Sequence, residues 1–137
     1  MKLLIVEPSQ LRCRISNILR LGGVEDVQAL SSSQEALRML ERESVDLVLI
    51  GPYLTAPSGP EFLRQLRLLE KHQYTATLIF LEAPTDEQVL EVAEQNVSGI
   101  IVVPFEDAYL LARVRETLRK LRHTKAYHKR LHIVRTG

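Results

Sequence analysis

The sequence predicts an α/β fold built on a doubly wound, five-stranded parallel sheet. Two observations carry this prediction. Short apolar runs recur along the chain, and each is followed by a stretch in which apolar residues have helical spacing. The runs are "LLIV" (3–6), "VQAL" (27–30), "DLVLI" (46–50), "ATLIFL" (76–81) and "GIIVV" (99–103). Strict alternation of strand and helix implies right-handed crossovers, and therefore a parallel sheet covered by helices on both faces.

Each predicted helix has its own signal. The first ends at a Gly-Gly pair, and the fourth begins at Thr85, which has the spacing of a capping box with Gln88. The apolar stripes, in chain order, are Leu11, Ile15, Ile18 and Leu19; Ala36, Leu37 and Leu40; Phe62, Leu63, Leu66 and Leu69; Val89, Val92 and Ala93; and Leu110, Leu111, Val114, Leu118 and Leu121.

Length and composition predict one ordinary globular domain. The chain has 137 residues, of which 45% are hydrophobic and 26% charged, and its apolar runs are too short to span a bilayer. The first residues make a poor signal peptide, so we expect a cytoplasmic location. Cys13 is the only cysteine, which excludes an internal disulfide and a multi-cysteine metal site. No glycine-rich phosphate-binding motif is present.

Charge divides the chain into two parts. Residues 1–112 hold 9 basic and 16 acidic side chains, for a net charge of −7, whereas residues 113–137 hold 9 basic and 1 acidic, for a net charge of +8. The stripe of apolar residues fades after Leu121, so we expect a domain over 1–121 and a basic extension over 122–137. The extension is a continuation of the last helix, a linker, or an arm that contacts nucleic acid.

Three stretches of this sequence resemble the receiver domain of two-component response regulators. They are "LLIVEPSQLR", "VDLVLIGPYLTAPSGPEFLRQLR" and "VVPFEDAYLLARVRETLRK", and the resemblance covers residues 1 to about 121. It implies a flavodoxin-like fold with strand order 2-1-3-4-5. It also implies a chemistry in which an aspartate takes a phosphoryl group from a phosphohistidine, assisted by Mg²⁺, an acid pair, a hydroxyl residue and a lysine.

The resemblance also places that machinery, and most of it is replaced. The acid pair falls on Glu7 and Pro8, the phosphoacceptor on Gly51, the hydroxyl residue on Glu82 and the lysine on Val103. Only Glu7 keeps a suitable group, so we expect Mg²⁺ binding to be lost or weak and no enzymatic activity. Burial of Glu7 beside Glu82 would be costly, so one of them should be exposed, protonated or bonded to a neighbour.

The output switch that the resemblance implies is altered too. Its moving hydroxyl residue falls on Glu82 and its aromatic residue on Ile100. The acidic residues that pair across a dimer with Arg113 and Arg115 in the family are replaced here, so these arginines should lack their usual partners. The fold therefore looks retained and the switch dismantled.

We therefore predict a pseudo-receiver that acts in signal transduction by binding a signalling protein or an output domain, without phosphorylation on aspartate. It has no predicted catalytic residue, cofactor or metal, and homodimerisation through the last helix is open. The candidate interaction surface consists of Arg113, Arg115, Arg119, Arg122 and Tyr127. Two alternatives remain. One is a switch operated by a ligand or by phosphorylation of a loop hydroxyl, the candidates being Ser9, Tyr53, Thr55 and Ser58. The other is a regulator that binds nucleic acid through its basic end.

Overall fold

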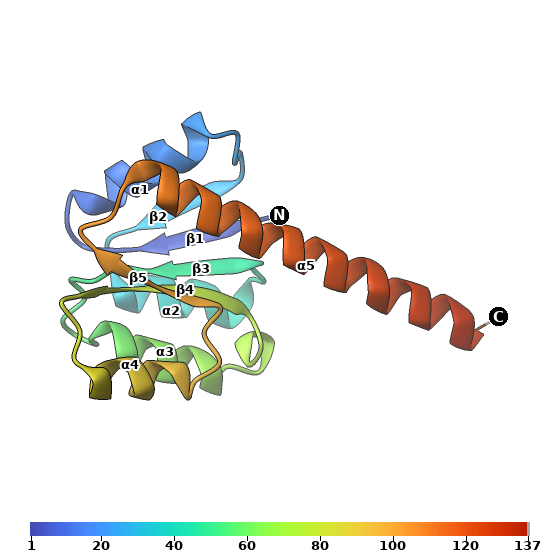
Figure 1. Ribbon diagram of the computed structural model, residues 1–137. Coiled ribbons are helices and arrows are strands. Elements are labelled where there is room, and N and C mark those ends of the chain that lie inside the picture. Colours follow the sequence, from blue (N-terminus) through green and yellow to red (C-terminus); the bar gives the residue numbers. More distant parts are fainter. Residues whose placement is uncertain (137) are drawn as a thin grey trace.

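The computed structural model describes the backbone of residues 1–136 and the side chains of residues 1–124. Its centre is a five-stranded parallel sheet in the order β2-β1-β3-β4-β5 (Figure 1). The predicted fold class and strand order are confirmed. The strands are β1 (Leu3–Val6), β2 (Val27–Leu30), β3 (Leu47–Ile50), β4 (Ala76–Glu82) and β5 (Gly99–Val103).

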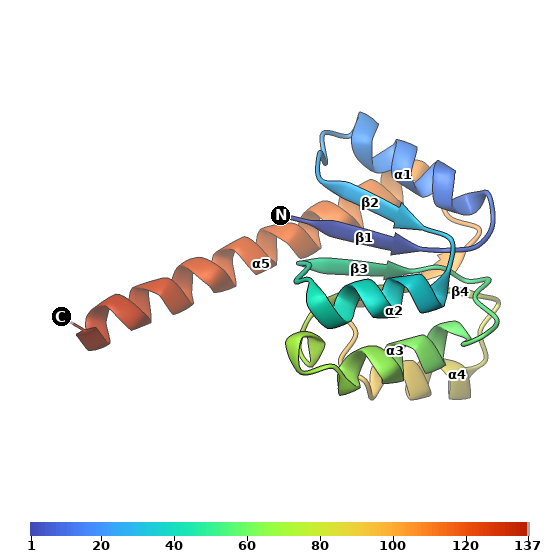
Figure 2. The same ribbon diagram turned by 180° about the vertical axis from the view of Figure 1, so that it is seen from behind.

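Helices cover both faces of the sheet. One face carries α1 and α5, and the other carries α2, α3 and α4 (Figures 1 and 2). The helices are α1 (Leu11–Leu21), α2 (Ser33–Arg42), α3 (Gly59–Leu68), the short 3₁₀ helix η1 (Glu70–His72), α4 (Asp86–Ala93) and α5 (Asp107–Thr136).

Alternation along the strands splits the core into two clusters. On β1, Leu3 and Ile5 pack with α1 and α5, whereas Leu4 and Val6 pack with α2 and α3, and all four are fully buried. A strand in the middle of a doubly covered sheet has no polar face, which explains why "LLIV" is continuous in apolar residues.

Side-chain caps begin three of the helices. Ser32 and Ser58 accept hydrogen bonds from the third residue of α2 and α3. Thr85 and Gln88 form the predicted capping box at the start of α4. The peptide bonds Ala56–Pro57 and Val103–Pro104 are cis.

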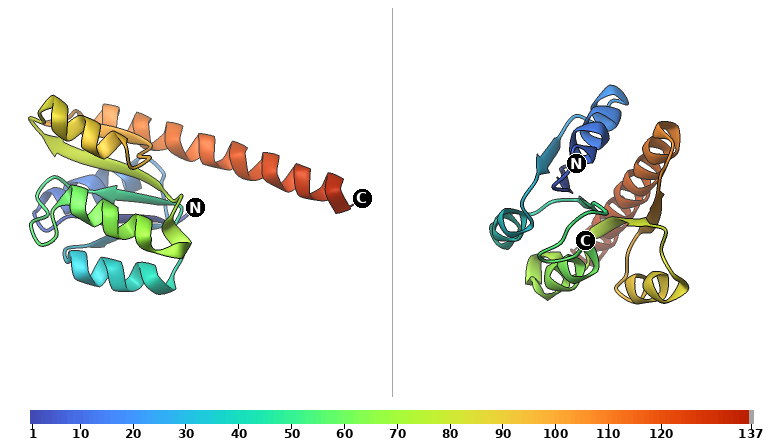
Figure 3. Two further views of the ribbon diagram at one scale, coloured as in Figure 1. Left: turned by 90° about the horizontal axis from the view of Figure 1, so that it is seen from below. Right: turned by 90° about the vertical axis from the view of Figure 1, so that its left-hand side faces the viewer.

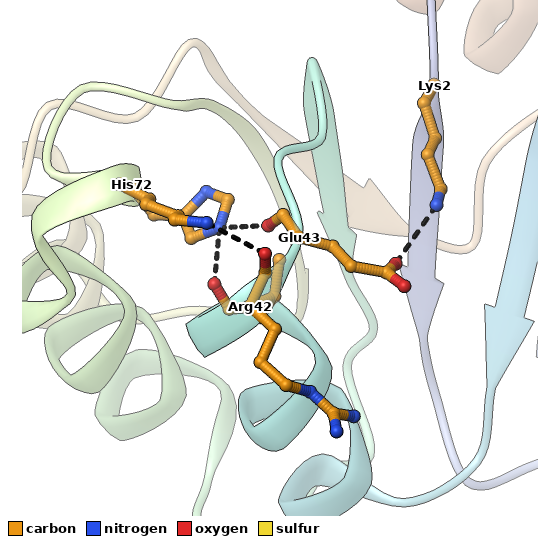
Figure 4. Close-up of polar contacts among 6 residues, drawn as sticks. Lys2, Arg42, Glu43 and His72 are labelled. Carbon is orange, nitrogen blue, oxygen red and sulfur yellow. Dashed lines mark hydrogen bonds and ion pairs between the residues drawn. The ribbon is translucent and has the colours of Figure 1, made fainter.

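A buried histidine ties η1 to the end of α2 (Figure 4). His72 is fully buried, and its Nε2 lies 2.8 Å from the main-chain oxygen of Leu40 and 2.9 Å from that of Glu43. Because both partners are carbonyl oxygens, Nε2 carries the proton and donates. Glu43 also pairs with Lys2 at 3.1 Å, which joins the same turn to β1. The hydrogen bonds of His72 and the ion pair of Glu43 therefore hold the elements together at the amino-terminal edge of the sheet.

Helix α5 is much longer than the sheet needs. It contains 30 residues, which corresponds to a length of about 45 Å at 1.5 Å per residue. Leu118 is buried and Leu121 still packs against the core, and beyond them the helix projects away from the domain (Figures 1 and 3). Among the described residues, no helix is long and apolar enough to cross a membrane.

Candidate functional site

The strand ends bring the predicted pocket residues to the carboxyl-terminal edge of the sheet. Glu7 directly follows β1, Gly51 directly follows β3, and Glu82 and Val103 end β4 and β5. Pro8 is exposed in the loop after β1 and offers no side-chain oxygen or nitrogen. The pocket positions therefore converge, as the carboxyl ends of parallel strands do at a functional crevice.

Glu7 is the buried polar group of this edge. Its side chain is fully buried, and its two carboxylate oxygens accept hydrogen bonds from main-chain N–H groups. Ser9 donates to Oε2 at 2.8 Å and Tyr53 donates to Oε1 at 3.0 Å. Arg12 does not pair with the carboxylate; its Nη1 donates to the main-chain oxygen of Glu7 at 2.9 Å. Two charge-assisted bonds thus hold the carboxylate between the β1 and β3 loops.

The Glu7 side chain fills the space above Gly51. A Cβ atom built on Gly51 would collide with Oε1 of Glu7 and would lie 2.6 Å from the Glu7 Cβ. Real Cβ atoms do not approach other atoms so closely, so a side chain at position 51 would have to displace the carboxylate or the backbone. Glycine at the tip of β3 is therefore part of the packing of Glu7.

Tyr53 links the buried carboxylate to an exposed one. Its main-chain N–H serves Glu7, while its phenol donates to Oε2 of Glu82 at 2.5 Å. That hydrogen bond is the main cause that raises the pKa of the Tyr53 phenol above its usual value of 10.0, and burial and the charges of Glu82 and Glu7 add to it. Glu7 is thus buried and bonded while Glu82 is exposed and bonded, so neither carboxylate is left without a donor.

A hollow lies beside this pair, where the β1, β3 and β5 loops meet. It has a volume of about 580 Å³, and its wall includes Leu11, Tyr53, Val103 and Phe105. Arg14 closes one side, with its guanidinium 4.7 Å above the Phe105 ring and an ion pair of 2.7 Å to Asp107. The wall is therefore mainly apolar, with one acidic rim and one basic rim.

The two remaining altered positions belong to the packed core. Val103 is buried in the cluster under α1 and α5, so its side chain supplies contacts and no charge. Ile100 is partly buried and packs against the other cluster, beneath α3 and α4. Ile100 has no aromatic ring that could change its orientation at this switch position.

A magnesium ion does not fit the residues of this edge. Mg²⁺ needs oxygen ligands in near-octahedral geometry. Pro8 and Gly51 supply no side-chain oxygen, and both oxygens of Glu7 are held by amides. Among the described residues, no group of three acidic, histidine or cysteine side chains could hold a metal ion.

Loop hydroxyls near the pocket have local bonding roles. Ser58 accepts from the N–H of Glu61 at 3.4 Å at the start of α3, and Ser9 accepts from the N–H of Leu11 at 3.2 Å at the start of α1. Such bonds satisfy the free N–H groups of a helix start.

The predicted interaction surface is divided by the structure. Arg113 lies against Gly99 and pairs with Glu116 at 3.5 Å, and Arg115 donates to the main-chain oxygen of Gly22. These two arginines therefore have partners within the chain. Arg119 and Arg122 are exposed on α5, and the side chain of Tyr127 lies outside the described residues.

The chain belongs to the response regulator receiver domain family, whose model matches residues 3–115. A curated relative is the chemotaxis protein CheY-3 of Vibrio cholerae, which is 30% identical over 122 residues that cover 88% of this chain and 94% of the relative. The chemotaxis protein CheY of Pseudomonas aeruginosa is 26% identical over 88% of this chain and 98% of the relative.

Solved structures show the same fold. The signal receiver domain of a putative LuxO repressor protein from Vibrio parahaemolyticus superposes with a TM-score of 0.82 at 16% identity, covering 92% of this chain and 95% of that one. The chemotaxis response regulator CheY4 of Vibrio cholerae gives a TM-score of 0.75 at 24% identity, covering 85% and 97%.

Sequence reasoning missed the part played by Tyr53. A tyrosine in a loop after a strand is expected to be a surface residue. The neighbouring residues in the sequence do not predict that its main-chain N–H and its phenol bond two different carboxylates. The available signal was the length of Glu7, because glutamate carries one more methylene than aspartate and stands near a glycine on the neighbouring strand. Sequence order alone does not reveal that this methylene spans the gap between the two strands.

Proposed function

We propose that this receiver domain does not accept a phosphoryl group at the tip of β3 and acts in signalling by binding another protein. One observation carries the proposal: the Glu7 carboxylate fills the space into which a side chain at position 51 would project. A phosphoryl acceptor needs a nucleophile, room for the incoming group and positive charge to neutralise it. Here the nucleophile is absent, the space for a side chain at position 51 is filled by Glu7, and the nearby acidic side chains Glu7 and Glu82 supply no positive charge.

Binding a partner requires none of these groups, because a folded scaffold with exposed side chains is sufficient. Leu90 on α4, Val102 on β5 and Tyr109 on α5 are large apolar residues with 63%, 49% and 49% of their surface exposed. Exposed residues of this kind on adjacent elements of a rigid domain are typical components of protein contacts. The partner that fits this surface is a signalling protein or an output domain.

The test is incubation of the full chain with a small-molecule phosphodonor and Mg²⁺, followed by intact-mass measurement. We expect no mass increase, and no acid-labile phosphate. A useful comparison is a variant in which the acceptor pocket is rebuilt by Glu7→Asp, Pro8→Asp, Gly51→Asp, Glu82→Thr and Val103→Lys, which should be labelled. Stoichiometric acid-labile phosphate on the unaltered chain would contradict the proposal.

The hollow beside Tyr53 favours a second candidate function, a switch operated by a small ligand. Its wall of Leu11, Val103 and Phe105 could shield an apolar group, and Glu82 and Arg14 could fix polar ends. A thermal-shift screen with a metabolite panel tests this candidate. A shift in the unaltered chain that disappears in Phe105→Ala but persists in Leu90→Ala, an exposed site on α4, would support it.

A further inference from the structure

The projecting end of α5 belongs to the most basic segment of the sequence. Glu116 is the last acidic residue, and residues 117–137 contain seven Lys or Arg and three His. In the described part, Arg115, Arg119 and Arg122 recur at helical spacing and are exposed. Glu116 pairs with Arg113 and Lys120, at 3.5 and 3.4 Å, so Arg119, Arg122 and the basic residues after them have no acid of their own within the helix.

This surface stands apart from the rest of the molecule. The helix leaves the domain near Leu121 and continues to Thr136 with no other element beside it (Figures 1 and 3). Residues 1–112 have a net charge of −7 and residues 113–137 a net charge of +8. An anionic partner is therefore attracted to the helix and repelled by the domain, which confines the contact to α5.

We propose that α5 from Arg119 onward is a docking surface for duplex nucleic acid, which it binds through the phosphate backbone. Charge complementarity is the argument: duplex DNA presents one phosphate about every 1.7 Å along its axis, and a basic helix gains affinity by releasing the counterions of those phosphates. A helix about 10–12 Å across also fits the major groove, which is about 12 Å wide.

The chemistry of the described side chains favours phosphate over other anionic partners. Arginine predominates, and its planar guanidinium donates two parallel hydrogen bonds to a phosphate. Docking to an acidic protein surface would be anchored by exposed aromatic or aliphatic residues, and insertion into a membrane surface needs an apolar face. Among the described residues of α5 that follow Tyr109, no large apolar side chain is exposed.

The test is fluorescence anisotropy of the full chain with a labelled duplex of about 20 base pairs, at several salt concentrations between roughly 50 and 200 mM. We expect affinity that falls steeply with salt. In Arg119→Gln/Arg122→Gln the slope of log K against log salt should become shallower by about two, and binding should weaken at least about tenfold, because each lost phosphate contact contributes about 0.9 to the slope.

A matched control is Arg38→Gln/Arg42→Gln, which removes the same charge from two exposed positions on α2. It should bind the duplex nearly as well as the unaltered chain. The proposal is overturned if the duplex is not bound at low salt, or if the control weakens binding as much as the α5 variant. It is also overturned if polyglutamate of matched charge displaces the duplex as readily as unlabelled duplex does, or if the chain binds anionic vesicles and not the duplex. These outcomes leave the phosphoryl proposal untouched, since it is measured by mass.

Discussion

The carboxyl-terminal edge of the sheet and the projecting end of α5 differ in how their charged groups are buried and bonded. At the sheet edge, Glu7 is fully buried and bonded by two amides, and Glu82 is bonded by Tyr53. On α5, Arg119 and Arg122 are exposed and have no ion pair among the described residues. At the sheet edge, where the receiver family carries out its chemistry, the carboxylates are hydrogen-bonded within the protein. On the last helix, the arginines are exposed to solvent.

The contrast teaches which surface is free to meet another molecule. A buried carboxylate that already accepts its hydrogen bonds gains little from an added ligand, and removing its donors is expensive. An exposed guanidinium is hydrogen-bonded to water. It can therefore exchange that water for a phosphate or a carboxylate. Four changes to the chain test this difference between the two regions.

The largest effect is expected at Glu7. Glu7→Ala removes a fully buried side chain and leaves the N–H groups of Ser9 and Tyr53 without their acceptors, so we expect the free energy of unfolding to fall by about 2–4 kcal/mol. Urea denaturation measures it. Glu82→Ala, at the exposed carboxylate, is the control and should cost under about 1 kcal/mol. Equal losses at both positions would mean that burial does not distinguish the two carboxylates.

The next effect concerns Gly51. Gly51→Ala places a methyl group on the Glu7 carboxylate, and relief of that overlap should cost about 1–3 kcal/mol of unfolding free energy. Gly59→Ala is the matched control, because its Cβ would meet neighbours at ordinary contact distances of 3.6 Å. The control should change stability by less than about 1 kcal/mol. A neutral Gly51→Ala would show that the Glu7 side chain and the backbone that carries it can shift freely.

A smaller effect is expected in the titration of Tyr53. Since the Tyr53 pKa is raised in the folded chain, the bond to Glu82 stabilises the fold below the ordinary tyrosine pKa of 10.0, and this contribution is lost as the pH rises through the folded-state pKa. The difference in ultraviolet absorbance between the unaltered chain and Tyr53→Phe isolates this phenol. Glu82→Gln should lower its pKa, and an unchanged titration would remove Glu82 as the cause.

The smallest effect on stability is expected from removal of residues 122–137. The core residues under α5 end at Leu121, so the free energy of unfolding should change by less than about 0.5 kcal/mol. The same truncation should abolish salt-dependent binding of duplex DNA. A large loss of stability would show that the end of α5 supports the domain.

The sequence predicted the features that depend on residue type and on near neighbours in the chain. The run "LLIV" is buried on both faces and has no alternation, so β1 is readable from its letters, and the capping box at Thr85 is local in the chain. Gly51 was placed by its register in the "LVLIGPYL" segment. The filling of the pocket was not readable, because it depends on the direction of one side chain across two strands.

The most direct test of whether Glu7 fills the space above Gly51 is a double-mutant cycle between these two residues. If the Glu7 side chain fills the space above Gly51, then Gly51→Ala should be nearly neutral in a Glu7→Gly background, which removes both the carboxylate and the Cβ atom 2.6 Å from the new methyl group. The coupling energy should be at least about 1 kcal/mol. The claim is contradicted if Gly51→Ala costs the same in both backgrounds, because the two positions would then not share that space.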